Sequence, residues 1–99
     1  MTAKSGNAKR PKRAVIPADV RTLDAVYDIL ARDLGLPAHF GRNLDALYDA
    51  LTGDLAGPIE IVVEDAAALE AALGAKARAL LKLFREASQA RRDFHLRCT

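Results

Sequence analysis

Three short strand-like segments, separated from one another by pairs of helix-like segments, are the feature that most limits how this chain can fold. The clearest strand is IEIVV at 59–63, which is short and β-branched and follows Pro58. RAVI at 13–16, ended by Pro17, and the alternating FHLRC at 94–98 are typical of two further strands. Helical connections favour parallel pairing with right-handed crossovers. We therefore expect an α/β fold, a single layered domain with a three-stranded parallel sheet packed with about four helices.

Four segments have the apolar spacing of helices, and their ends carry helix-terminating signals. The expected ranges are about 23–34, 44–52, 66–73 and 75–90. Side chains that suit N-caps precede the first three, namely Thr22, Asn43 and Asp65. Glycines suited to the C′ position follow the same three helices, namely Gly35, Gly53 and Gly74. Arg91 and Arg92 suit the C-terminal end of the fourth.

Basic residues are concentrated at the start of the chain. The first thirteen residues include five Lys or Arg and no acid, whereas the remaining 86 hold 10 basic and 13 acidic residues. Because residues 1–12 have little apolar surface to bury, we expect a disordered basic tail before a domain over 13–99. The net charge of +2 therefore hides a mildly acidic body and is no reason to expect a nucleic-acid partner.

Several function classes are excluded by what the sequence lacks. No apolar run approaches the roughly 20 residues of a membrane span, and no apolar segment near the start suggests a secretory signal. Cys98 is the only cysteine, so no internal disulfide forms, and we expect a cytoplasmic protein with Cys98 as a small buried residue. His39 and His95 have no zinc-site spacing, and nucleotide-binding and nucleophile motifs are absent. We therefore predict no catalytic residue, no metal and no cofactor.

One face of the expected helix over 44–52 gathers groups that could bind a partner. At 100° per residue, Tyr48, Thr52, Asp45 and Asp49 fall in one arc about 100° wide, away from the leucines. Asp45 and Asp49 lie one turn apart, and such like-charge pairs cost about 0.2–0.5 kcal/mol. The pattern alone leaves two interpretations open, a binding face or ordinary solvated charges, because the helix dipole favours an acid such as Asp45 in the first turn.

The segment LPAHFGRNLDALYDALTG at 36–53 resembles the barstar family of intracellular ribonuclease inhibitors. LFREA at 83–87 and the order of strands and helices agree, so the resemblance spans about residues 13–99. It implies a barstar-like fold and inhibition without catalysis, in which an acidic helix and the preceding loop cover the active site of a secreted, barnase-type, guanyl-specific ribonuclease. Carboxylates would mimic RNA phosphates there, because they accept charge-assisted hydrogen bonds from guanidinium groups.

The resemblance also implies roles for individual residues. Asp49 would be the anchor in place of a phosphate, and Asp45 would make the second charge contact. Tyr48 and His39 hold the positions of aromatic contact residues. The other predicted partner-binding residues are Thr52 and Gly53 at the helix end, Asn43 and Arg42 in the loop, Asp54 after the helix, and Glu86 on the last helix.

Several contact positions depart from the family pattern and leave the partner open. His39 replaces another aromatic residue, Tyr48 replaces a tryptophan, and Asp54 occupies the place of a second tryptophan. One alternative is therefore an immunity or interaction protein of the same fold for a different basic toxin or enzyme. Another is a small nucleic-acid-binding protein that uses the basic tail, although the tail has no aromatic residue for base stacking. We expect a free monomer that contacts neither membrane nor nucleic acid directly.

Overall fold

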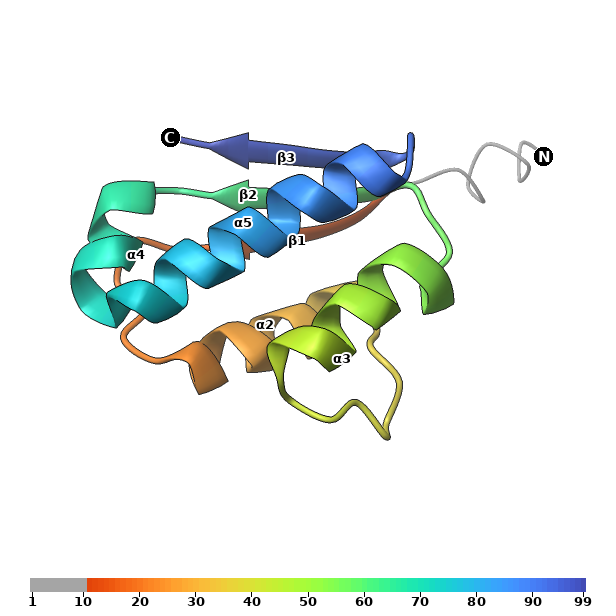
Figure 1. Cartoon of the computed structure of the whole chain (residues 1–99), viewed down its shortest axis with the longest axis horizontal. Coiled ribbons are helices and arrows are strands. Elements are labelled where there is room, and N and C mark those ends of the chain that lie inside the picture. The colour runs from red at the N-terminus through yellow and green to blue at the C-terminus, as the bar shows by residue number, and fades with distance from the viewer. Residues whose placement is uncertain (1–10) are drawn as a thin grey trace, which may run out of the picture.

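The computed structural model describes residues 11–99 and contains one parallel sheet and four α-helices (Figure 1). The strands are β1 (Lys12–Ile16), β2 (Ile59–Val63) and β3 (Phe94–Cys98). The helices are α2 (Leu23–Leu34), α3 (Leu44–Asp49), α4 (Ala66–Leu73) and α5 (Ala75–Ala90), with a π-helical turn, η1 (Ala50–Asp54), directly after α3. The predicted fold class is thus confirmed. β1 begins at Lys12, one residue earlier than expected, and the tail prediction for residues 1–10 lies outside the described residues.

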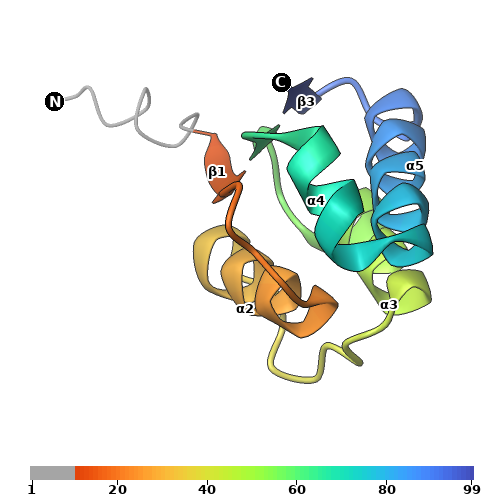
Figure 2. The same ribbon diagram turned by 90° about the vertical axis from the view of Figure 1, so that its left-hand side faces the viewer.

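The sheet has the order β1-β2-β3, and both strand pairs are parallel. Ile61 of β2 faces Ala14 of β1 on one side and Leu96 of β3 on the other. Because both crossovers step in the same direction, right-handed connections place their helices on the same face of the sheet. Figure 2 shows this arrangement, with all four α-helices on one side of the three strands. No helix formed by residues 11–99 covers the other face of the sheet.

The core lies between this covered face and the helices. Alternate strand side chains point into it and are fully or nearly fully buried, namely Ala14, Ile16, Ile59, Ile61, Val63 and Phe94. Phe84 of α5 is the largest fully buried side chain. Since residues in between, such as Glu60 and Val62, are only half-buried, the period of two in the sequence matches one packed and one open face. Cys98 is exposed near the end of β3, so the prediction that it is buried is wrong.

The predicted caps form as expected for three helices. The side chains of Thr22, Asn43 and Asp65 accept hydrogen bonds from backbone N–H groups three residues ahead, at 2.8–3.0 Å. Gly35 ends α2 with a left-handed φ of 72°, a conformation that a residue with a Cβ adopts only at a cost. Sequence signals thus set where α2, α3 and α4 begin.

The end of the contact helix differs from the prediction. We expected one helix over 44–52 with Gly53 at C′, but α3 ends at Asp49 and the chain continues as η1, whose last bond runs from the Leu55 N–H to the Ala50 carbonyl at 3.0 Å. Gly53 has no left-handed φ. A tertiary contact accounts for this difference. The Arg91 guanidinium donates to the carbonyls of Leu51 and Leu55, both at 2.8 Å, so these carbonyls at the end of the helical segment have a hydrogen-bond donor from another part of the chain.

Candidate functional site

The predicted contact helix, α3, is fixed by leucines packed in the core and by a side-chain cap at its N-terminus. Leu47 and Leu51 are fully buried in the core. At the N-terminus, the Asn43 amide oxygen accepts from the Ala46 N–H at 2.8 Å, while Asn43 Nδ2 donates to the Gly41 carbonyl at 3.2 Å. Both the oxygen and the nitrogen of this amide therefore make hydrogen bonds within the chain, so Asn43 acts as the N-cap of α3.

Asp45 and Asp49 lie on the outward face of α3, and both are exposed. Within residues 11–99, neither carboxylate accepts a hydrogen bond or joins an ion pair, unlike the paired acids on α2 and before β3. Two like charges one helical turn apart are mildly unfavourable in the free protein. Unpaired, exposed carboxylates on a rigid helix are available to a cationic partner.

Two hollows flank Asp49. The larger, of about 540 Å³, is a groove between α3 and α5, which lie side by side in Figure 2. The smaller, of about 220 Å³, lies between α3 and the preceding loop and is bordered by His39 and Phe40. Because Asp49 borders both, side chains of a partner could approach its carboxylate from two directions.

The groove between α3 and α5 brings predicted residues of two distant segments together. Its α3 wall includes Asp45, Tyr48 and Asp49, and its α5 wall includes Glu86. Lys82 is the basic residue in this lining, and its Nζ lies 3.9 Å from Glu86 Oε2 in an exposed i,i+4 pair. The groove is therefore acidic overall, with its α5 side partly neutralised.

Tyr48 and Thr52 are less free than the two acids. Tyr48 is half-buried and packs against the core at the rim of the groove. The Thr52 hydroxyl donates to the Tyr48 carbonyl at 2.7 Å, so its hydrogen is used within the helix. Gly53 is exposed in η1, and the backbone of Asp54 ends that turn.

Arg42 does not belong to the acidic face as the structure has it. Its guanidinium donates to Asp24 and Asp28 of α2, with Nη2 at 2.6 Å from Asp24 Oδ1 and 2.9 Å from Asp28 Oδ1. These hydrogen bonds raise the pKa of Arg42 above its ordinary value. Sequence reasoning missed this role. The available signal was a pair of acids four residues apart on the preceding helix, which by itself does not name a partner.

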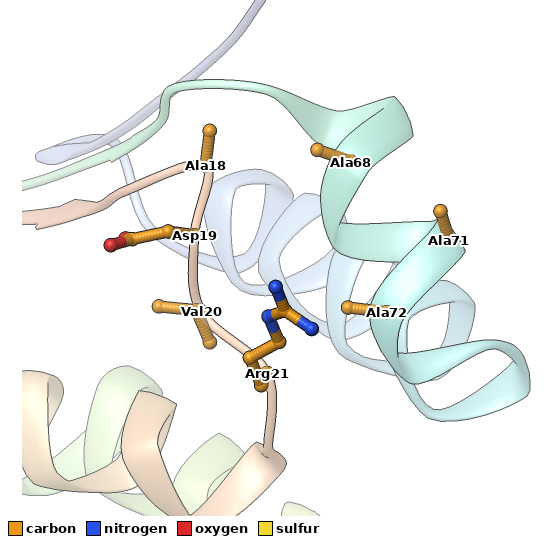
Figure 3. A pocket seen from close by; sticks show the side chains of 7 residues that line it. All are labelled: Ala18, Asp19, Val20, Arg21, Ala68, Ala71 and Ala72. Carbon is orange, nitrogen blue, oxygen red and sulfur yellow. The ribbon is translucent and has the colours of Figure 1, made fainter.

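Another hollow, of about 770 Å³, lies between the loop after β1 and α4 (Figure 3). Alanines form its α4 wall, and the Arg21 guanidinium points toward the space while Asp19 points away from α4. It contains no predicted site residue and no cluster of acids or bases, so it gives no chemistry to build on. Across residues 11–99, no three His, Cys, Asp or Glu side chains gather as metal ligands, and no helix there is long and apolar enough to span a membrane.

A family model described as Barstar (barnase inhibitor) matches residues 13–99. The chain belongs to the barstar family. The match covers nearly the whole chain and includes every predicted contact residue. A comparison with curated proteins finds no match. Barstar-family membership implies a function like that of the barnase inhibitor for which the family is named, and the parallel three-stranded sheet and four helices agree with the fold expected from the resemblance.

Proposed function

We propose that this barstar-family chain inhibits a ribonuclease by placing α3 and the loop over residues 37–43 across its active site. Asp49 is the anchor in a phosphate site, and Asp45 makes the second charge contact. The observation that carries the proposal is the pair of exposed carboxylates that have no partner within residues 11–99. Guanidinium groups that bind RNA phosphate can instead donate charge-assisted, bidentate hydrogen bonds to these carboxylates.

The charge and shape of this face support a basic ribonuclease as the partner. A guanyl-specific, barnase-type ribonuclease with a basic active site has the complementary charge, and the two hollows beside Asp49 accept side chains around the anchor. Acidic faces also accelerate encounter with a basic partner, in a manner that salt weakens. We place this inhibitor in the cytoplasm, where it would protect the cell from its own nuclease.

The test is a titration of the protein into a barnase-type, guanyl-specific ribonuclease while RNA cleavage is followed. The wild-type chain should inhibit at a one-to-one ratio, and Asp49→Asn should lose most of that inhibition with the fold intact. Asp19→Asn is the matched control, because it removes the same charge from an exposed acid in the loop between β1 and α2. Inhibition of wild-type strength by Asp49→Asn would rule out the anchor.

A different basic toxin is the second candidate partner. His39 and Tyr48, which depart from the family pattern, border the two hollows beside Asp49, where side chains of a partner would enter. Absence of inhibition by the wild-type chain, together with capture of a basic toxin that Asp49→Asn fails to capture, would favour this candidate over a barnase-type nuclease.

A further inference from the structure

The side chain of Arg42 joins the loop that precedes α3 to α2 by hydrogen bonds. Its Nη2 donates to Asp24 Oδ1 at 2.6 Å, to the Asp24 carbonyl at 3.1 Å and to Asp28 Oδ1 at 2.9 Å. Its Nε donates to Asp24 Oδ1 at 3.1 Å. A planar guanidinium suits such a site, because its donors have fixed relative directions that a lysine ammonium lacks.

An aromatic ring on α2 supports the same loop. The guanidinium carbon of Arg42 lies 5.7 Å from the centroid of the Tyr27 ring, within cation–π range. Phe40 meets the same ring edge-on, with centroids 5.5 Å apart and planes at 80°. Tyr27 is only 4% exposed, so it is a fixed surface against which two loop residues pack.

The backbone conformation of Arg42 supports the same conclusion. Its φ is 53°, and among residues 11–99 it is the one residue other than glycine with a positive φ. This left-handed conformation is disfavoured for a side chain with a Cβ and persists where surrounding contacts impose it. The contacts with α2 are the visible source of that constraint.

We propose that Arg42 is a positioning residue. Its hydrogen bonds to Asp24 and Asp28, which we call the clamp, order the loop over residues 37–43 and the start of α3 before a partner binds. The proposal rests on the proposed function of the same face. Arg42 directly precedes Asn43, the N-cap of α3, so its backbone sets where that helix begins. A loop ordered in advance loses less conformational freedom on binding, and affinity rises accordingly.

The first test needs no partner. Hydrogen exchange is measured at the Phe40 amide, which donates to the Pro37 carbonyl at 2.9 Å. Arg42→Gln and, separately, the double variant Asp24→Asn/Asp28→Asn should each exchange roughly tenfold faster there, and combining them should add little, because groups in one network are not additive. Raised salt should have the same effect on the wild-type chain, since these ion pairs are exposed.

The control is Arg32→Gln, which removes another exposed arginine–aspartate pair of α2, with Asp33, that does not reach the loop. Should Arg42→Gln fold poorly, Arg42→Gly serves instead, because glycine tolerates the backbone conformation while lacking the clamp. Unchanged exchange at Phe40 in the variants that fold would overturn the proposal, whether or not any nuclease is inhibited.

The second test uses the barnase-type ribonuclease. Arg42→Gln and Asp24→Asn/Asp28→Asn should weaken inhibition equally, by about 5- to 20-fold, with no further loss when combined. If Arg42 instead reached the partner, Arg42→Gln alone would weaken inhibition, and this result would overturn the positioning role. Failure of the wild-type chain to inhibit would overturn the proposed function alone. Hydrogen exchange at the Phe40 amide would still test whether Arg42 orders the loop.

Discussion

Replacing Arg91 by methionine should destabilise the protein by weakening η1, the turn that follows α3. Arg91 follows α5, yet its Nη1 donates to the carbonyls of Leu51 and Leu55, both at 2.8 Å. Its Nε and Nη2 donate to the Asp93 carboxylate at 2.7 and 2.9 Å. The side chain is only 15% exposed, so water cannot freely replace these bonds. Methionine keeps most of the apolar stem and removes the donors.

The magnitude follows from the two bonds to backbone carbonyls. Hydrogen bonds from a charged donor contribute about 1.5–3 kcal/mol each. Partial access of water to the site reduces the sum, and we expect Arg91→Met to lower the free energy of unfolding by about 2–4 kcal/mol. For a domain of this size, that loss corresponds to a fall in the melting temperature of roughly 10–30 °C.

The assay is urea denaturation of Arg91→Met followed by circular dichroism, with Arg92→Met as the control. Arg92 is the exposed neighbour of Arg91, so its substitution should change stability by no more than about 0.5 kcal/mol. A loss below about 1 kcal/mol in Arg91→Met would refute the view that this guanidinium holds η1.

Three further changes test other parts of the structure. The hydrogen bonds from Arg91 lower the pKa of Asp93, so its stabilising effect is present above the ordinary aspartate pKa of about 3.9 and is lost as pH falls through the lowered value. Urea denaturation at about pH 6 and pH 2.5 should therefore show a smaller acid-induced loss of stability in Asp93→Asn than in the wild-type chain. Asn43→Ala removes the cap of α3 and should cost about 1 kcal/mol by thermal denaturation, whereas Asn43→Asp should retain most of the stability. Gly57→Ala should lower the melting temperature because its Cβ would collide with the Asp93 carboxylate, whereas Gly53→Ala, with nothing within 4 Å of its Cβ, should not lower it.

Local patterns predicted most of the fold because the signals were themselves local. The run IEIVV became the central strand β2, and the alternation of buried and half-buried residues along it follows from one covered face. Thr22, Asn43 and Asp65 cap the helices they were expected to cap, because each oxygen reaches an N–H only three residues away. For the site, periodicity correctly placed Asp45 and Asp49 together on the outer face of α3.

Local sequence patterns could not predict the tertiary contacts that two arginines make. Arg42 reaches acids 14 and 18 residues away, and Arg91 reaches carbonyls 36 and 40 residues away. The dipole argument explained Arg91 as a charge at the end of α5 and so missed its contact with η1, which is why Gly53 was misplaced as a helix end.

These two arginines also explain how Asp45 and Asp49 can lack an ion-pair partner within residues 11–99. Arg42 holds the loop before α3, and Arg91 holds the turn after it, so both ends of the helix are fixed by guanidinium groups from outside the acidic face. Each forms ion pairs with acids away from that face, in α2 for Arg42 and before β3 for Arg91. Asp45 and Asp49 therefore stay in place without an ion pair to any residue in the range 11–99. If this division of charge matters for binding, then supplying an internal cation beside Asp49, as in Ala46→Arg, should weaken inhibition while leaving the fold stable. Ala46→Gln is the control for the added bulk, and equal inhibition by the two variants would count against the argument.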